Sequence, residues 1–218
     1  MDRLFDIECR PPWLIARFAD RQRMASWSLN RPGLVEADTV AWLQVRDADL
    51  PVGVDPLGML ERRLAQRGLG EAVGLMTARE IEHHHITNSR DDRVRVDAMV
   101  TLGLTNGITL DGAGNPVDLA AKPALVGTIN MLVAVSCPLS AGAMLEAMSI
   151  AAVARTAALL ANGDGIVGTG TDCIVVACPD HTPGEAFAGL HTDIGAHVTA
   201  SVFQAVRQAH ERWAGDAS

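Results

Sequence analysis

The stretch VGTGTDCIVVACP, residues 167–179, places small turn formers and one acid, Asp172, directly before an apolar strand. Gly168 and Gly170 let the backbone approach a ligand closely, and backbone N–H groups there can polarise a carbonyl. A phosphate-binding loop needs the order strand, loop, helix, because the helix N-terminus faces the anion. Here a predicted helix precedes the loop and a strand follows it, which disfavours a phosphate site. Two hypotheses stand for Asp172: a catalytic acid, or a brace for the loop amides.

Other polar residues stand at similar turns. The segment GTIN places Asn130 at the start of an apolar strand, with Thr128 two positions earlier. The segment GLTNG has the outline of a nucleophile elbow centred on Thr105, next to Asn106. An elbow requires a helix after the nucleophile, whereas the following ITLDG reads as a strand. We therefore predict a hairpin turn at this Asn-Gly pair.

The segment AGLHTDIGAH places His191 and Thr192 at the start of the last predicted helix. A histidine with a reference pKa near 6.5 can act as a general acid or base. The alternative is that Thr192 or Asp193 caps the helix. If the last strand and helix pack antiparallel, His191 need not approach Asp172. The connection between them is nevertheless long enough to return the chain to the same end of the sheet.

The run EHHH at 82–85 is the one histidine cluster that suggests a metal. No H-E-x-x-H pattern or third ligand accompanies it, so we predict a solvated surface run and no metal site. The four cysteines form no CxxC pair, which indicates free thiols in a reducing cytoplasm. Cys173 and Cys178 lie five positions apart and should face opposite sides of their strand, without activation.

Apolar periodicity predicts the elements that must position these residues. Helical spacing occupies 55–70, 139–163 and 191–213. Strand patterns occupy 11–18, 24–33, 40–51, both halves of 93–112, the end of 119–138, and 167–179. Strand and helix alternate in the second half, which implies a parallel pair with a right-handed crossover. We predict an α/β fold: one domain, residues 1–218, with a mixed sheet flanked by helices.

Two segments in that half resemble copies of one unit. Gly127-Thr128 and Gly168-Thr169 each stand ten residues before a Cys-Pro pair, and the two units are offset by 41 residues. Each unit continues from the Cys-Pro pair into a long helix. The spacing suggests two related strand–helix units side by side in one sheet.

Composition excludes several classes of function. The chain has 218 residues and a formal net charge of −8, without a Lys/Arg cluster. Nucleic-acid binding and attachment to an anionic membrane both need basic surface, so neither is expected. No run of about 18 uninterrupted apolar residues is present, and the N-terminus lacks the apolar region of a secretion signal. We expect a cytoplasmic protein, and its apolar last helix is compatible with a homodimer.

Seven stretches, in this order, resemble the adenosylcobinamide amidohydrolases of corrinoid salvage. They are RMASWSLNRPG, GLMTA, TLGLTNG, GTINMLVAVSCPLS, EAMSIAAVARTAAL, GTGTDCIVVACP and AGLHTDIGAHV. The resemblance implies hydrolysis of the amide between a corrin propionate and the aminopropanol arm, giving adenosylcobyric acid. It implies no protein cofactor, because cobalt belongs to the corrinoid substrate. The alternative is a corrinoid-binding carrier or sensor without activity, in which His181 or His191 ligates cobalt.

Under the resemblance, water attacks the amide carbonyl with His191 or Asp172 as the base, while loop amides and Asn106 or Asn130 stabilise the oxyanion. A covalent nucleophile, Thr169 or Thr171, ranks second, since no activating base is adjacent. The expected substrate-binding residues are Asn30, Thr105, Asn106, Thr128, Asn130, Gly168, Gly170 and Thr192. Two departures from the family pattern stand out: NRPG where a glycine-rich NGG is expected, and His197 where an acid commonly follows the glycine.

Overall fold

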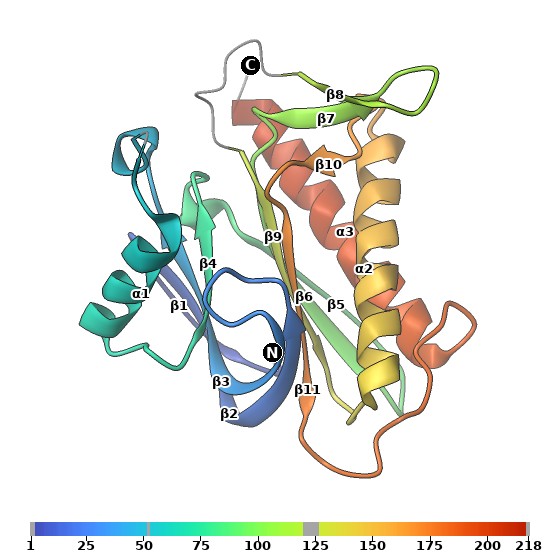
Figure 1. Ribbon diagram of the computed structural model, residues 1–218. Helices are drawn as coiled ribbons and strands as arrows, with labels where there is room; N and C mark the ends of the chain where they lie inside the picture. The colour runs from blue at the N-terminus through green and yellow to red at the C-terminus, as the bar shows by residue number, and fades with distance from the viewer. Residues whose placement is uncertain (1–2, 52, 120–126, 217–218) are drawn as a thin grey trace.

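A computed structural model describes residues 3–51, 53–119 and 127–216. Over these residues eight strands form a mixed sheet in the order β4-β3-β2-β11-β9-β6-β5, with β1 paired to the first half of β2 (Figure 1). Its strands are β1 Asp6–Arg10, β2 Trp13–Ser26, β3 Gly33–Gln44, β4 Val73–Thr77, β5 His85–Arg90, β6 Arg95–Leu102, β9 Ile129–Val135 and β11 Cys173–Pro179. A three-stranded sheet holds β7 Gly107–Leu110, β8 Pro116–Asp118 and β10 Gly168–Thr169.

The helices are α1 Pro56–Arg67, α2 Ala141–Ala161 and α3 Asp193–Asp216, with 3₁₀ turns at Asp47–Asp49 and Ile81–His83. Figure 1 shows α2 and α3 side by side over one side of the sheet and α1 near β3 and β4. The ends of α1 and α2 carry ordinary caps: Asp55 and Ser140 accept N-terminal N–H groups, and Gly68 adopts the left-handed conformation after α1. The mixed α/β fold predicted from the sequence is confirmed, and the three helices lie where periodicity placed them.

The crossover predicted in the second half is present. Strand β9 leads through α2 into β11, and the two strands pair in parallel. The two strand–helix units therefore lie side by side, as their spacing suggested. Their register differs from the sequence repeat, however: Asn130 pairs with Cys173, an offset of 43, so the repeat spacing of 41 is two residues out of step with the pairing.

Alternation along β9 and β11 separates two apolar cores. Ile129, Met131 and Val133 pack under α2 and α3, together with alternate residues of β11. Leu132 and Ala134 point the other way, into a core shared with β1 to β4. A third core packs Leu60 and Leu64 of α1 on β2 and β3. Because side chains alternate with period two, Asn130 and its register partner Cys173 share the side away from α2 and α3.

Helix α2 is long and apolar enough by length and composition to cross a membrane. Its residues Ala143, Ala147, Ala151 and Ala154 are nonetheless buried against the sheet and α3. Small side chains at this spacing let α2 lie close to its neighbours. We interpret α2 as the core helix of an α/β domain.

The hairpin predicted over residues 93–112 is wrong. A turn does form at Asn106-Gly107, where the Gly107 N–H donates to the Leu104 carbonyl. The flanking strands do not pair, because β6 joins β9 in the large sheet and β7 joins β8 and β10 in the small one. The strand expected at 11–18 and the first residues of the one expected at 24–33 form a single strand, β2, with a register shift between Arg17 and Gln22; residues 27–32 are a loop. The strand expected at 40–51 is the second half of β3, which ends at Gln44.

Candidate active site

A cavity of about 520 Å³ opens where β9 and β11 begin and β4 ends. The loop after β2 and the segment leading into α1 complete its wall. Its lining is mostly apolar, with a small number of polar side chains, which is the usual composition of a small-molecule site. The polar lining residues are Ser28, Asp55, Thr77, Thr128, Asn130, Thr171 and Asp172.

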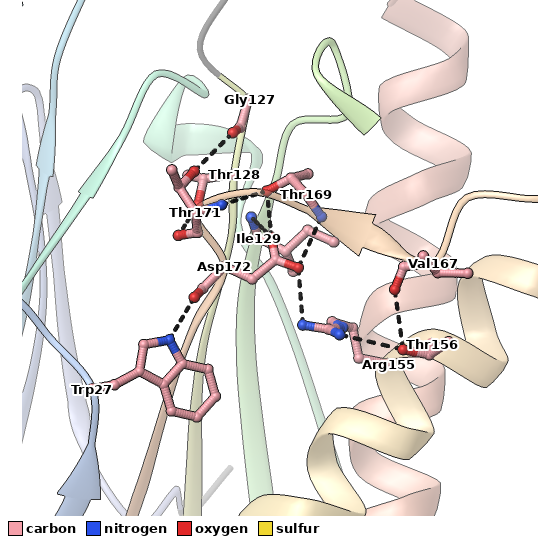
Figure 2. A network of polar contacts seen from close by, with 10 residues as sticks. All are labelled: Trp27, Gly127, Thr128, Ile129, Arg155, Thr156, Val167, Thr169, Thr171 and Asp172. Carbon is pink, nitrogen blue, oxygen red and sulfur yellow. Dashed lines mark hydrogen bonds and ion pairs between the residues drawn. The ribbon is translucent and has the colours of Figure 1, made fainter. Parts of the chain in front are cut away.

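The Asp172 carboxylate lies at the centre of a hydrogen-bond network (Figure 2). One oxygen accepts the Ile129 N–H at 3.0 Å and the Thr169 hydroxyl at 2.5 Å. The other accepts the Arg155 guanidinium at 2.9 Å and the Thr169 N–H at 3.0 Å. Only 7% of the side chain is exposed. Four donors occupy all the acceptor positions of a carboxylate, so Asp172 ties β9, β10 and α2 together and keeps no lone pair for a water.

The neighbouring threonines use their hydroxyls in the same way. The Thr128 hydroxyl donates to the Thr171 carbonyl at 2.9 Å, and the Thr171 hydroxyl donates to the Gly127 carbonyl at 3.2 Å. These bonds join the start of β9 to the start of β11 (Figure 2). The Thr169 hydroxyl has a carboxylate, that of Asp172, within hydrogen-bond distance, but Thr169 does not line the cavity. Thr171 lines the cavity, but its hydroxyl donates to a backbone carbonyl and has no base beside it among the described residues. Neither threonine therefore combines a position on the cavity wall with an adjacent base, as a covalent nucleophile requires.

Asn130, the second residue of β9, lines the cavity. It is 2% exposed, and its amide nitrogen donates one hydrogen bond, 2.6 Å long, to the Met76 carbonyl. An amide nitrogen has two donors, so the second N–H is available to a ligand carbonyl. The bond to Met76 also fixes the side chain between β9 and β4 before any ligand arrives, which is the preorganisation an oxyanion site needs.

His191 and Thr192 lie at the other end of the sheet. They follow β11, whose seven residues, at about 3.3 Å each, separate its two ends by roughly 20 Å. Thr192 caps α3: its hydroxyl accepts the Gly195 N–H at 3.0 Å and donates to the Gly189 carbonyl. The chain does not return to the cavity after β11, so the structure does not bring His191 to Asp172.

The family model for adenosylcobinamide amidohydrolases matches residues 2–218. The chain belongs to this family.

The chain is similar to two curated adenosylcobinamide amidohydrolases. That of Halobacterium salinarum is 36% identical over 152 residues, 66% of this chain and 62% of that protein. That of Methanosarcina mazei is 28% identical over 145 residues, 62% of this chain and 64% of that protein. The matched part thus spans less than two thirds of either relative. A solved protein of Pyrococcus horikoshii OT3, 12% identical, aligns with a TM-score of 0.50 over 90% of this chain and 76% of its own. That likeness shows the fold alone.

The family motifs converge on the cavity from separate parts of the chain. The cavity wall takes Ser28 from the SWSLN stretch, Thr77 from GLMTA, Thr128 and Asn130 from GTIN, and Thr171 from GTGTD. The other three stretches, TLGLTNG, EAMSIAAVARTAAL and AGLHTDIGAHV around His191, supply no residue to it. Of the predicted substrate-binding residues, Thr128, Asn130 and Gly170 line the cavity, whereas Asn30, Thr105, Asn106, Gly168 and Thr192 do not.

Asn30 and Asn106 lie outside the lining and contact segments next to it. Asn30 accepts the Gly74 N–H and donates to the Ala72 carbonyl, both at 2.9 Å, which attaches the loop after β2 to β4. Arg31, in the NRPG turn, donates from its guanidinium to the Glu71 and Glu36 carbonyls, and neither glutamate lines the cavity. Near Gly127, the Asn106 Oδ1 atom is buried, and the described residues offer it no hydrogen-bond partner.

Sequence reasoning missed Trp27, Ser28, Asp55 and Thr77, all of which line the cavity of this amidohydrolase family member. Three of them stand inside motifs that carried the resemblance, so the motifs themselves were the signal. Asp55 carried a different signal, because Asp-Pro reads as the cap of a helix. It is that cap, with Oδ1 accepting the Leu57 N–H at 3.1 Å and Oδ2 beside Gly58, and the residue also lines the cavity.

Cys173 is the one thiol on the cavity wall. Burial raises the pKa of this thiol to about 12, so it stays protonated and unreactive at neutral pH. Cys178 lies in the core under α2 and α3, on the opposite face of β11, as its spacing predicted, and burial raises its pKa too. None of the comparisons favours the carrier alternative. His181 and His191, its candidate cobalt ligands, both follow the end of β11 that points away from the cavity.

Proposed function

We propose that this protein hydrolyses the amide that joins the aminopropanol arm of adenosylcobinamide to the corrin ring, giving adenosylcobyric acid and the free amine. The observation that carries the proposal is the convergence of four of the seven motif stretches on one cavity at the start of β9 and β11. Both curated relatives bear the name of this activity. In this proposal the aminopropanol arm and its amide bind inside the cavity.

In the proposed reaction Asn130 holds the amide oxygen. Its free amide N–H donates a hydrogen bond to the carbonyl oxygen, and this bond strengthens as that oxygen becomes an oxyanion. Water adds to the carbonyl carbon, the C–N bond breaks, and the proton that leaves the water is passed to the departing amine. Apolar walls around the amide strengthen this interaction because they exclude bulk water.

The proposed general base is Asp55. The cavity is bordered by two carboxylates over the part of the chain that the structure describes, Asp55 and Asp172. The Asp172 carboxylate already accepts four hydrogen bonds, whereas over the described residues the Asp55 carboxylate accepts one, from the Leu57 N–H on Oδ1. Oδ2 of Asp55 is therefore the oxygen assigned to the water. Asp172 becomes a positioning residue that keeps the start of β9, and with it Asn130, in place.

The proposal needs no resident cofactor, because the cobalt arrives with the substrate. The residues that the structure describes include no group of three or more His, Cys, Asp or Glu side chains arranged to hold a metal ion. A cytoplasmic location and assembly as a homodimer are parts of the proposal, supported by the four free cysteines and the apolar outer residues Leu145 and Val153 of α2.

The test is conversion of adenosylcobinamide by purified protein, with and without chelator, followed by mass spectrometry of the corrinoid. Formation of adenosylcobyric acid in both samples is expected. Asp55→Asn is the decisive variant, because Asn is an equally good helix cap and preserves α1 while it removes the base. We expect it to lower kcat about 10²- to 10⁴-fold with an unchanged melting temperature.

The matched control is Asp49→Asn, which removes a carboxylate from the nearby 3₁₀ turn outside the cavity lining. It should leave kcat within about twofold, as surface substitutions away from a site normally do. Product that forms equally fast with Asp55→Asn contradicts the assignment of the base. A spectral change of the corrinoid without any product contradicts the hydrolase and supports the carrier.

A further inference from the structure

The size of the cavity limits how much of a corrinoid it can hold. At about 520 Å³ it lies within the usual range of roughly 300–1,000 Å³ for pockets that bury drug-sized ligands. Adenosylcobinamide is far larger, since it carries a macrocycle, several amide side chains and a nucleoside. If an arm of the substrate occupies the cavity, as the proposed function requires, the ring system must lie outside, against the rim.

The rim carries three exposed apolar side chains. Trp27 is 46% exposed, Leu29 52% and Leu57 37%, and all three line the cavity. They come from two separate segments, the loop after β2 and the first turn of α1. Exposed apolar residues that gather at one mouth mark a binding surface more often than scattered ones do.

Trp27 is exposed but held in place. Its indole N–H donates to the Asp172 carbonyl at 2.6 Å, and Figure 2 shows the nitrogen edge of the ring turned toward that atom. Its own loop is fastened at the other side, where Asn30 bonds to the backbone of β4. The Ser28 N–H donates to the Ser26 hydroxyl between these two points. An aromatic ring fixed before binding loses little conformational entropy when a ligand stacks on it.

We propose that Trp27, flanked by Leu29 and Leu57, is the platform on which a flat apolar ring of the substrate rests while the arm enters the cavity. The platform residue is a specificity determinant: it selects amides attached to a large planar system over small free amides. Two parts of the substrate have this chemistry, the corrin macrocycle and the adenine of the upper ligand. The inference rests on the proposed function for the identity of the ligand, but the platform can be tested without turnover.

The test measures binding by isothermal titration calorimetry with three probes: cobinamide without the adenosyl ligand, adenosylcobinamide, and cobyric acid, which has the ring but lacks the arm. The variants are Trp27→Ala and Trp27→Phe. Phe187→Ala is the matched control, because Phe187 is another exposed aromatic residue, 68% exposed, in the loop between β11 and α3 and outside the cavity lining. Melting temperatures confirm that each variant is folded.

Trp27→Ala should weaken the binding of all three probes about tenfold or more, equivalent to about 1.4 kcal/mol or more, if the macrocycle rests on the indole. Trp27→Phe should weaken binding less, because it keeps a flat ring, and Phe187→Ala should change nothing. A loss confined to adenosylcobinamide assigns the platform to adenine.

Unchanged affinity of folded Trp27→Ala for every probe overturns the platform, even if the protein is an active hydrolase. Conversely, ring binding that depends on Trp27 in a protein that never releases adenosylcobyric acid supports the platform and overturns the proposed function. In the active protein, the platform also requires Trp27→Ala to raise KM far more than it lowers kcat.

Discussion

Replacing Asp172 by Asn separates the bracing role of this residue from a catalytic one. The substitution removes a charge that is 7% exposed and paired with Arg155, itself 15% exposed. It also places an amide NH₂ group where one carboxylate oxygen now accepts two hydrogen bonds. Breaking a buried ion pair from one side costs about 3–5 kcal/mol, because the partner charge stays buried and unpaired.

We take the lower end, about 3 kcal/mol, since an Asn oxygen can still accept part of the network. At about 2–4 °C per kcal/mol for a domain of this size, the melting temperature should fall by about 6–12 °C. The assay is thermal and urea unfolding of Asp172→Asn beside Glu211→Gln. The control breaks the Arg207–Glu211 pair, in which the side chains are 44% and 62% exposed, and should cost less than about 0.5 kcal/mol.

A double-mutant cycle sharpens the result. Arg155→Met alone should destabilise the protein by a similar amount, because it leaves the Asp172 charge unpaired, and the double variant should lose much less than the sum of the two. Turnover of folded Asp172→Asn, measured well below its melting temperature, should fall only modestly. The bracing role is refuted if the melting temperature matches that of Glu211→Gln while kcat drops by about 10³-fold or more, the loss expected for a general base.

The cavity wall yields two further predictions. With its pKa raised to about 12 by burial, Cys173 should resist iodoacetamide at pH 8 in the native protein, as mapped by mass spectrometry, and label fully after unfolding. Because the folded state holds this proton more tightly, its contribution to the free energy of unfolding is complete below pH 9 and is lost as the pH rises toward 12. Gly127→Ala would bring a methyl group to 2.8 Å from the Gly103 carbonyl, so it should displace Thr128 and lower kcat at least about tenfold. Gly70→Ala, which meets open space away from the cavity lining, should not; equal activities of the two variants contradict this reasoning.

Local signals in the sequence were sufficient for the helices and for the central parallel pair. Capping residues such as Asp55 and Ser140 stand at helix starts, and Gly68 ends α1. The apolar runs of β9 and β11, separated by a helical pattern, have one common solution, a right-handed crossover between parallel strands. These features depend on residues close together in the chain.

The errors come from contacts that are remote in sequence. Strand β2 continues through the polar stretch RFADRQR because different neighbours pair with its two halves, β1 with the first and β11 with the second. The prediction of a hairpin was wrong because the strands on either side of the Asn-Gly turn belong to different sheets. Periodicity reports which face of an element is apolar, but it does not name the element that covers that face.

The lining of the cavity could be predicted only in part, for the same reason. Glycine, threonine and asparagine at the starts of β9 and β11 were recognisable from their strands, and Thr128, Asn130 and Thr171 do line the cavity. The partner of Asp172 was not recognisable, because Arg155 stands in the middle of an apolar helix and no local pattern links it to a loop 17 residues away. The distance of His191 from the cavity depends on the direction of the loop after β11, which sequence length alone leaves open.

The position of the cavity also explains why side chains must supply the positive potential of the proposed site. Ligands of open parallel sheets usually bind at the carboxyl ends of the strands, where helix N-termini contribute positive charge. Here the cavity lies at the amino ends of β9 and β11, beside the C-terminal half of α2. The dipole of α2 therefore directs its negative pole toward this end of the sheet, where Asp172 adds another negative charge. Arg155 neutralises that charge, and the Asn130 side chain provides a hydrogen-bond donor in place of a helix N-terminus. Arg155→Met should for this reason leave Asn130 donating to a carbonyl in a more negative field, and should slow amide hydrolysis beyond its effect on folding.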